Sequence, residues 1–130
     1  MLKIANDSIF YLELQKNHRF PMIKYQLLPE ILINEGTCID SNFFIPNNIN
    51  EKYILLTHDK NYYNKLINFE LDKKEQRAIG FPMSQELIQR EKKIVQGTIE
   101  SSLNSIKYMV SMNIAGGTHH AFSNLSLIHI

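Results

Sequence analysis

The longest regular pattern in the sequence is a helical one that begins after Ser84. Ser84 is a good N-cap residue, and apolar side chains then recur at intervals of three, four and seven: Leu87, Ile88, Ile94, Val95, Ile99, Leu103 and Ile106. This stripe predicts a long amphipathic helix whose apolar side covers one face of a sheet. Residues 108–115 predict the strand that follows, and Gly116-Gly117 ends it in a loop. A strand, a long helix, a second strand and a glycine loop are typical of an α/β protein with a parallel sheet.

The first third of the chain shows the same alternation of strand and helix patterns. Residues 8–12 are a β-branched and aromatic run and predict the first strand. Apolar residues at helical spacing follow Pro21, which suits the opening turn of a helix, and continue until Gly36 supplies a stop. Pro29 interrupts this stretch, so the pattern fits one bent helix and two shorter helices equally well.

The middle of the chain predicts shorter elements. Residues 42–50 carry asparagines and Pro46, which indicates a connection with a brief strand at residues 43–45. Residues 51–57 predict a short helix.

Two aspartates mark the starts of the next two helices. Asp59 is expected to cap a helix whose apolar positions fall on one side: Tyr62, Tyr63, Leu66, Ile67 and Phe69. Asp72 and Glu75 resemble a capping box for a short helix that ends near Gly80. His58 is interpreted as a packed or solvated neighbour of the Asp59 cap, because adjacent residues at a helix start rarely point together.

Composition adds mainly exclusions. At 130 residues, with 44% hydrophobic and 21% charged residues, the chain is long enough for one ordinary globular domain. The net charge is +1 and the basic residues are scattered, which argues against nucleic-acid and membrane partners. Cys38 is the only cysteine, so the chain can form neither a disulfide framework nor a thiolate zinc cluster. Polar residues interrupt every apolar run near the start, so we expect a cytoplasmic protein without a signal peptide.

The candidate chemistry lies in two adjacent histidines, His119 and His120, which follow the Gly116-Gly117 turn. The carboxyl ends of strands are where open α/β sheets place their ligands. One imidazole can exchange protons there while the other tunes the field around it, and the glycines leave room for a substrate. The pattern by itself also fits a surface pair or a chance metal binder.

The histidine segment belongs to an ordered set of motifs that resembles a known family. Gly-Gly-Thr-His-His-Ala-Phe at residues 116–122 resembles the tandem-histidine signature of the histone deacetylase and acetylpolyamine amidohydrolase superfamily, in its bacterial branch close to the class IV deacetylases. Other segments agree in order and spacing: His-Arg-Phe-Pro-Met-Ile-Lys-Tyr at 18–25, Leu-Thr-His-Asp-Lys-Asn-Tyr at 56–62, Ile-Gly-Phe-Pro-Met-Ser at 79–84 and Gly-Thr-Ile at 97–99. The resemblance covers roughly residues 8–123. It implies the amino-terminal part of a three-layer, parallel-sheet, arginase/deacetylase-like fold.

The resemblance also implies an activity and residue roles. The family hydrolyses acetyl-lysine or related acetylated amines with a zinc ion that has three protein ligands and an open side. His120 would be the general base, and His119 a second, supporting histidine. Gly117 and Phe122 would contact the substrate. His18 and Arg19 would form the channel rim, although a helix-entry segment explains them as well.

The resemblance ends before the family's metal ligands. In the family the zinc ligands and the oxyanion-stabilising tyrosine follow the histidine motif, so we expect zinc only in an intact parent protein and an inactive fragment here. Residues 1–124 are interpreted as the amino-terminal portion of one deacetylase domain. Residues 125–130, Leu-Ser-Leu-Ile-His-Ile, match the translation of a transposase adapter used in sequencing libraries. The alternatives are a non-catalytic truncated fragment and a small metal-binding or interaction protein.

Overall fold

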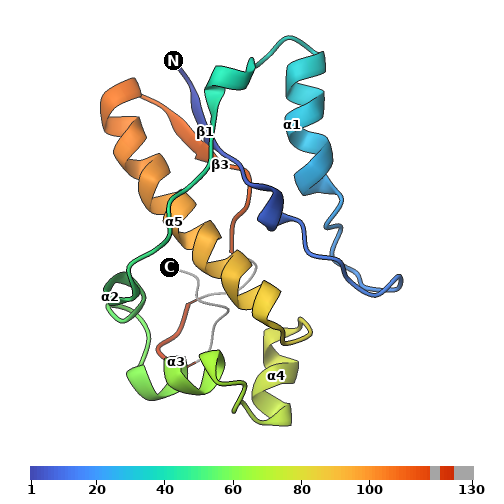
Figure 1. Cartoon of the computed structure of the whole chain (residues 1–130), viewed down its shortest axis with the longest axis vertical. Coiled ribbons are helices and arrows are strands. Elements are labelled where there is room, and N and C mark those ends of the chain that lie inside the picture. The colour runs from blue at the N-terminus through green and yellow to red at the C-terminus, as the bar shows by residue number, and fades with distance from the viewer. Residues whose placement is uncertain (118–120, 125–130) are drawn as a thin grey trace.

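A long helix lies along a small parallel sheet in the computed structural model, which describes residues 1–117 and 121–124 (Figure 1). The three strands of the sheet are in the order β2-β1-β3, and β1 pairs with both neighbours in parallel. The predicted mixture of helices with a parallel sheet is therefore confirmed. The elements are β1 (Lys3–Ala5), the 3-10 helix η1 (Ser8–Phe10), α1 (Lys24–Asn34), the 3-10 helix η2 (Asp40–Asn42), β2 (Phe43–Phe44), α2 (Glu51–Ile54), α3 (Lys60–Ile67), α4 (Lys73–Ile79), α5 (Gln85–Tyr108) and β3 (Ser111–Asn113).

The first strand lies earlier than the sequence pattern predicts. Residues 8–12 were expected to form it, but Ser8–Phe10 is a 3-10 helix, and β1 occupies Lys3–Ala5. The physical reason is Asp7, whose carboxylate accepts a hydrogen bond from the Ile9 N–H at 3.1 Å and so favours a turn over a ladder. Ile4 and Ala5 are buried in the middle of the sheet.

The end of α5 differs from the prediction in a related way. The helix continues to Tyr108, and Met109 ends it with a positive φ of 72°. The strand expected over residues 108–115 therefore shrinks to Ser111–Asn113. Leu103 and Ile106, which the pattern places on the buried stripe, are 62% and 82% exposed because they lie on the side of α5 that faces away from Ser101, whose hydroxyl donates to the Met112 carbonyl of β3.

The helix starts predicted at Asp59, Asp72 and Ser84 are confirmed at their caps, whereas α1 begins at Lys24 rather than at Pro21 and α2 ends at Ile54 rather than at Thr57. The Asp59 carboxylate accepts hydrogen bonds from the backbone N–H groups of the first turn of α3, and Asp72 with Glu75 forms the predicted capping box of α4. Ser84 caps α5 through the Leu87 N–H at 3.1 Å. Pro29 lies inside a single continuous α1, which settles the alternative between one helix and two.

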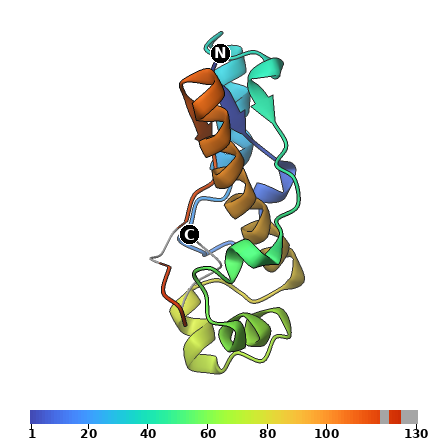
Figure 2. The same cartoon turned by 90° about the vertical axis from the view of Figure 1, so that its left-hand side faces the viewer.

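A glycine lets α5 approach the sheet closely. A Cβ atom on Gly97 would lie 2.9 Å from Asn113 Nδ2 and 3.2 Å from Pro46 Cγ. The Asn113 carboxamide uses this approach, because its Nδ2 donates to the Ile94 carbonyl at 2.9 Å and lies 3.1 Å from Thr98 Oγ1. The strands lie between α5 and α1 in both views (Figures 1 and 2). No helix in the described part of the chain is both long and apolar enough to cross a membrane.

Candidate functional site

Two connecting segments leave the same edge of the sheet. Because β1 and β3 are adjacent and parallel, the segment after Ala5 and the segment after Asn113 both start at the carboxyl edge. The first segment contains His18 and Arg19, and the second contains Gly116, Gly117 and the histidine pair. His119 and His120 themselves lie outside the residues that the structure describes.

The second segment is fixed where it leaves β3. The Ile114 N–H donates to the Ala5 carbonyl at 3.2 Å, which extends the ladder by one bond. Ala115 is fully buried, and its N–H donates to Asn113 Oδ1 at 3.3 Å. Gly116 and Gly117 are exposed, and a Cβ on Gly116 would meet no atom within 4 Å. Gly116 therefore leaves open space beside the chain, and no close contact with the described residues requires a glycine there.

The same segment is held again beyond the histidine pair. The His58 Nδ1 atom lies 2.9 Å from the Phe122 carbonyl oxygen, and the Asp59 N–H donates to the Ser123 carbonyl at 2.8 Å. His58 is only 4% exposed, so of the two alternatives, a packed or a solvated side chain, the structure shows the packed one, and His58 also bonds to the Phe122 carbonyl. The Phe122 side chain is 55% exposed.

His18 is bonded on both ring nitrogens. Its Nδ1 accepts the Phe20 N–H at 3.2 Å, and its Nε2 therefore carries the hydrogen and donates to the Gly80 carbonyl, also at 3.2 Å. The ring stacks on Phe81 with centroids 5.2 Å apart, and Phe20 packs edge-on against the same ring. His18 thus joins the loop before α1 to the turn after α4, whereas Arg19 is exposed.

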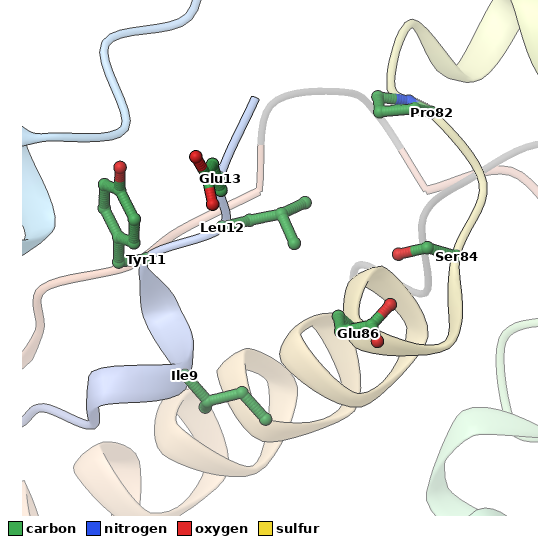
Figure 3. Close-up of a pocket in the computed structure, with 7 residues that line it drawn as sticks. All are labelled: Ile9, Tyr11, Leu12, Glu13, Pro82, Ser84 and Glu86. Carbon is green, nitrogen blue, oxygen red and sulfur yellow. The ribbon is translucent and has the colours of Figure 1, made fainter. Parts of the chain in front are cut away.

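A hollow lies beside these loops, between the segment after η1 and the start of α5. Its volume is about 480 Å³, and it is lined by Ile9, Tyr11, Leu12, Glu13, Pro82, Ser84 and Glu86 (Figure 3). The pKa of Glu86 is lowered by a hydrogen bond from its own backbone N–H and by the Ser84 hydroxyl, so this carboxylate is an anion at neutral pH. The hollow can accommodate an apolar chain beside two carboxylates. None of these lining residues was among the predicted site residues.

A buried ion pair ties the first segment to α5. Arg90 donates through Nε to the Phe10 carbonyl at 2.6 Å, pairs with the carboxylate of Glu91, and places its guanidinium 5.0 Å from the Tyr25 ring centroid. Burial raises the pKa of Glu91 to about 7, against the opposing effect of Arg90. Neither residue of this pair was among the predicted site residues. The spacing of Glu91 could have indicated its burial, because it lies four residues after Leu87 and three before Ile94, on the apolar stripe itself.

Metal binding has no candidate within the described residues. Over residues 1–117 and 121–124, no group of three or more His, Cys, Asp or Glu side chains is placed to hold an ion. Among the predicted site residues that the structure describes, His18 contacts Phe81 and the Gly80 carbonyl, and Phe122 is held through its backbone by His58.

Comparison with known proteins finds an uncharacterized relative. No family model matches the chain. Over 107 residues the chain is 35% identical to an uncharacterized protein of Picosynechococcus sp., a match that covers 82% of the chain and 36% of the relative. The chain thus spans well under half the length of this curated relative.

Proposed function

We propose that this chain is the amino-terminal part of a zinc-dependent deacetylase that hydrolyses acetyl-lysine or a related acetylated amine. The observation that carries the proposal is the ordered motif set that ends in Gly-Gly-Thr-His-His-Ala-Phe at residues 116–122. Two structural facts support it. The segment that bears the histidines starts at the carboxyl edge of a parallel sheet, and the loop with His18 and Arg19 starts at the same edge, on the adjacent strand. A relative much longer than the chain fits an intact protein with further residues.

In this proposal the chain's own residues handle protons and substrate. His120 takes a proton from the attacking water as the new C–O bond forms, and it returns that proton to the amine nitrogen as the C–N bond breaks. His119 supports the charge that develops during this exchange. Gly117 and Phe122 contact the acyl-amine chain, and the loop of His18 and Arg19 forms the rim of its channel. The described residues do not provide a zinc site, so the proposal assigns the zinc ligands to residues of the intact protein outside this chain.

The experiment is to sequence the gene through its natural stop codon and express the full product. Acetate release is measured with an acetyl-lysine peptide and with a monoacetylated diamine, with and without a zinc chelator. We expect chelator-sensitive hydrolysis that His120→Ala lowers by about 10²- to 10⁴-fold, the range for loss of a general base. The rates with the two substrates decide between a peptide and a small-amine substrate.

Two outcomes of these experiments would overturn the proposed deacetylase function. A full product that lacks an Asp-x-His segment and a later aspartate after the histidine pair, or that is folded and zinc-loaded but releases no acetate, overturns the proposal. The 130-residue chain assayed in parallel is expected to be inactive.

A further inference from the structure

His58 and Asp59 hold the chain just beyond the histidine pair with two hydrogen bonds. His58 Nδ1 meets the Phe122 carbonyl at 2.9 Å, and the Asp59 N–H meets the Ser123 carbonyl at 2.8 Å. Consecutive residues at the start of α3 thus bind consecutive carbonyls more than sixty residues away. We propose that His58 is a positioning residue, which together with the Asp59 amide forms a clasp on Phe122 and Ser123, the residues that follow the histidine pair in the chain.

The hydrogen bond assigns the tautomer of His58. A carbonyl oxygen can only accept, so Nδ1 must carry the hydrogen. In the neutral imidazole Nε2 is then the nitrogen without a hydrogen, and within the described part of the chain it is buried without a hydrogen-bond partner. Burying an unpaired acceptor costs stability. His58 therefore stabilises the structure through Nδ1–H and packing, including the tilted contact with Tyr62, and not through Nε2.

His58 and His18 differ in which ring nitrogen donates a hydrogen bond. His18 donates through Nε2 and accepts through Nδ1, whereas His58 donates through Nδ1. An asparagine side chain places an N–H close to the position of histidine Nδ1–H and has nothing at the Nε2 position. Asparagine at position 58 should therefore keep the clasp and remove the unpaired nitrogen.

The clasp matters because the segment is anchored at both ends. Ile114 and Ala115 bond to β1 and to Asn113 on one side, and Phe122 and Ser123 bond to the clasp on the other. Only residues 116–121 lie between these anchors, and the histidine pair is among them. Loss of the clasp removes one of these two anchors, and a displacement of about 1 Å at a catalytic group can lower a rate about 10²-fold.

The clasp can be tested on the 130-residue chain without any activity. We compare wild type with His58→Asn, His58→Leu and the neighbouring control Thr57→Ala. ¹⁵N shifts of the wild-type imidazole should show a protonated Nδ1 and an unprotonated Nε2. Hydrogen exchange of the Asp59 amide, which donates to Ser123, should speed up about tenfold in His58→Leu, on the order of one lost hydrogen bond, and stay near wild type in the other two variants.

Each result decides for or against the clasp. A wild-type His58 whose Nδ1 carries no hydrogen overturns it. So does an unchanged Asp59 exchange rate in a His58→Leu chain whose α5 amides remain protected. If His58→Leu fails to fold, the tautomer and the behaviour of His58→Asn decide, because an Asp59 amide exposed in a folded His58→Asn chain also contradicts the clasp.

The catalytic consequence rests on the proposed function and is tested in the full product. We expect His58→Leu to lower kcat about 10²-fold with little change in KM, and His58→Asn to restore most of the rate. A full product without deacetylase activity, in a chain that shows the tautomer and the exchange pattern, refutes the proposed function and leaves the clasp intact. An active product whose kcat is insensitive to His58→Leu refutes the positioning role and leaves the function intact.

Discussion

Replacing Gly97 with alanine measures how tightly α5 packs on the sheet. Alanine in a helix interior is favoured over glycine by about 0.8–1.0 kcal/mol, so propensity alone predicts a more stable protein. The new Cβ would however lie 2.9 Å from Asn113 Nδ2 and 3.2 Å from the ring of the buried Pro46. The proline ring can adjust only by changing its pucker, and the Asn113 carboxamide is the nearer group, so the carboxamide must move.

The cost of that movement follows from the bonds that Asn113 makes. Its Nδ2 bonds the Ile94 carbonyl and Thr98 Oγ1, and losing both costs about 1 kcal/mol each. With crowding against Pro46 added and the helix propensity subtracted, Gly97→Ala should lower the free energy of unfolding by about 1–2 kcal/mol.

Urea unfolding of Gly97→Ala, Asn113→Ala and the double variant checks this reasoning. In the Asn113→Ala background the clash with the carboxamide and its two bonds are already gone, and the helix propensity of alanine offsets the remaining crowding against Pro46, so Gly97→Ala should be nearly neutral there. The coupling between the two sites should then be about 1–2 kcal/mol, well above what independent sites show. A Gly97→Ala variant that is more stable than wild type would refute the close approach.

Two further predictions concern burial. The pKa of Glu91 in the folded state is about 7, above its ordinary 4.5, so the folded protein binds more protons than the unfolded chain between these two pH values. The contribution of Glu91 to stability therefore falls by about 3 kcal/mol as pH rises through that window. Urea unfolding at pH 5 and pH 8 should show this fall in wild type and not in Glu91→Gln; equal pH dependence in both would contradict the assignment. The exposed apolar residues at the end of α5, Leu103, Ile106 and Met109, are expected to make the isolated chain self-associate. Ile106→Glu should reduce this association in sedimentation velocity with no loss of thermal stability, and a loss of stability would show that Ile106 is buried.

Local chemistry explains which elements could be predicted from sequence. Asp59, Asp72 with Glu75, and Ser84 cap helices through backbone groups two or three residues away, so the signal for each cap lies entirely in adjacent residues. The predicted position of the first strand was wrong because of a similar local bond. The Asp7 carboxylate caps a 3-10 helix at Ser8–Phe10, and this turn forms in place of the strand that the β-branched and aromatic residues predict.

The site was less predictable because its contacts join distant residues. The bond between His58 and Phe122 spans 64 positions, and the bond between Arg90 and Phe10 spans 80. Neither partner's own neighbours in sequence indicate which carbonyl it will meet. Sequence reasoning found residue types in suggestive places, such as His18 beside Phe20, but their pairing depends on the tertiary fold.

The position of β1 in the sheet has a consequence for synthesis. β1 is the middle strand of the sheet, and it comes before β2 and β3 in the chain. Its pairing with β3 joins Lys3 to Ser111, whose hydroxyl donates to the Lys3 carbonyl across 108 positions. On the ribosome the buried Ile4 and Ala5 are therefore made 108 positions before the residues of their second neighbouring strand. Until then one edge of β1 stays open to mispairing. We expect α5, which precedes β3 and folds locally, to cover this strand first and to protect the nascent chain while the sheet is completed.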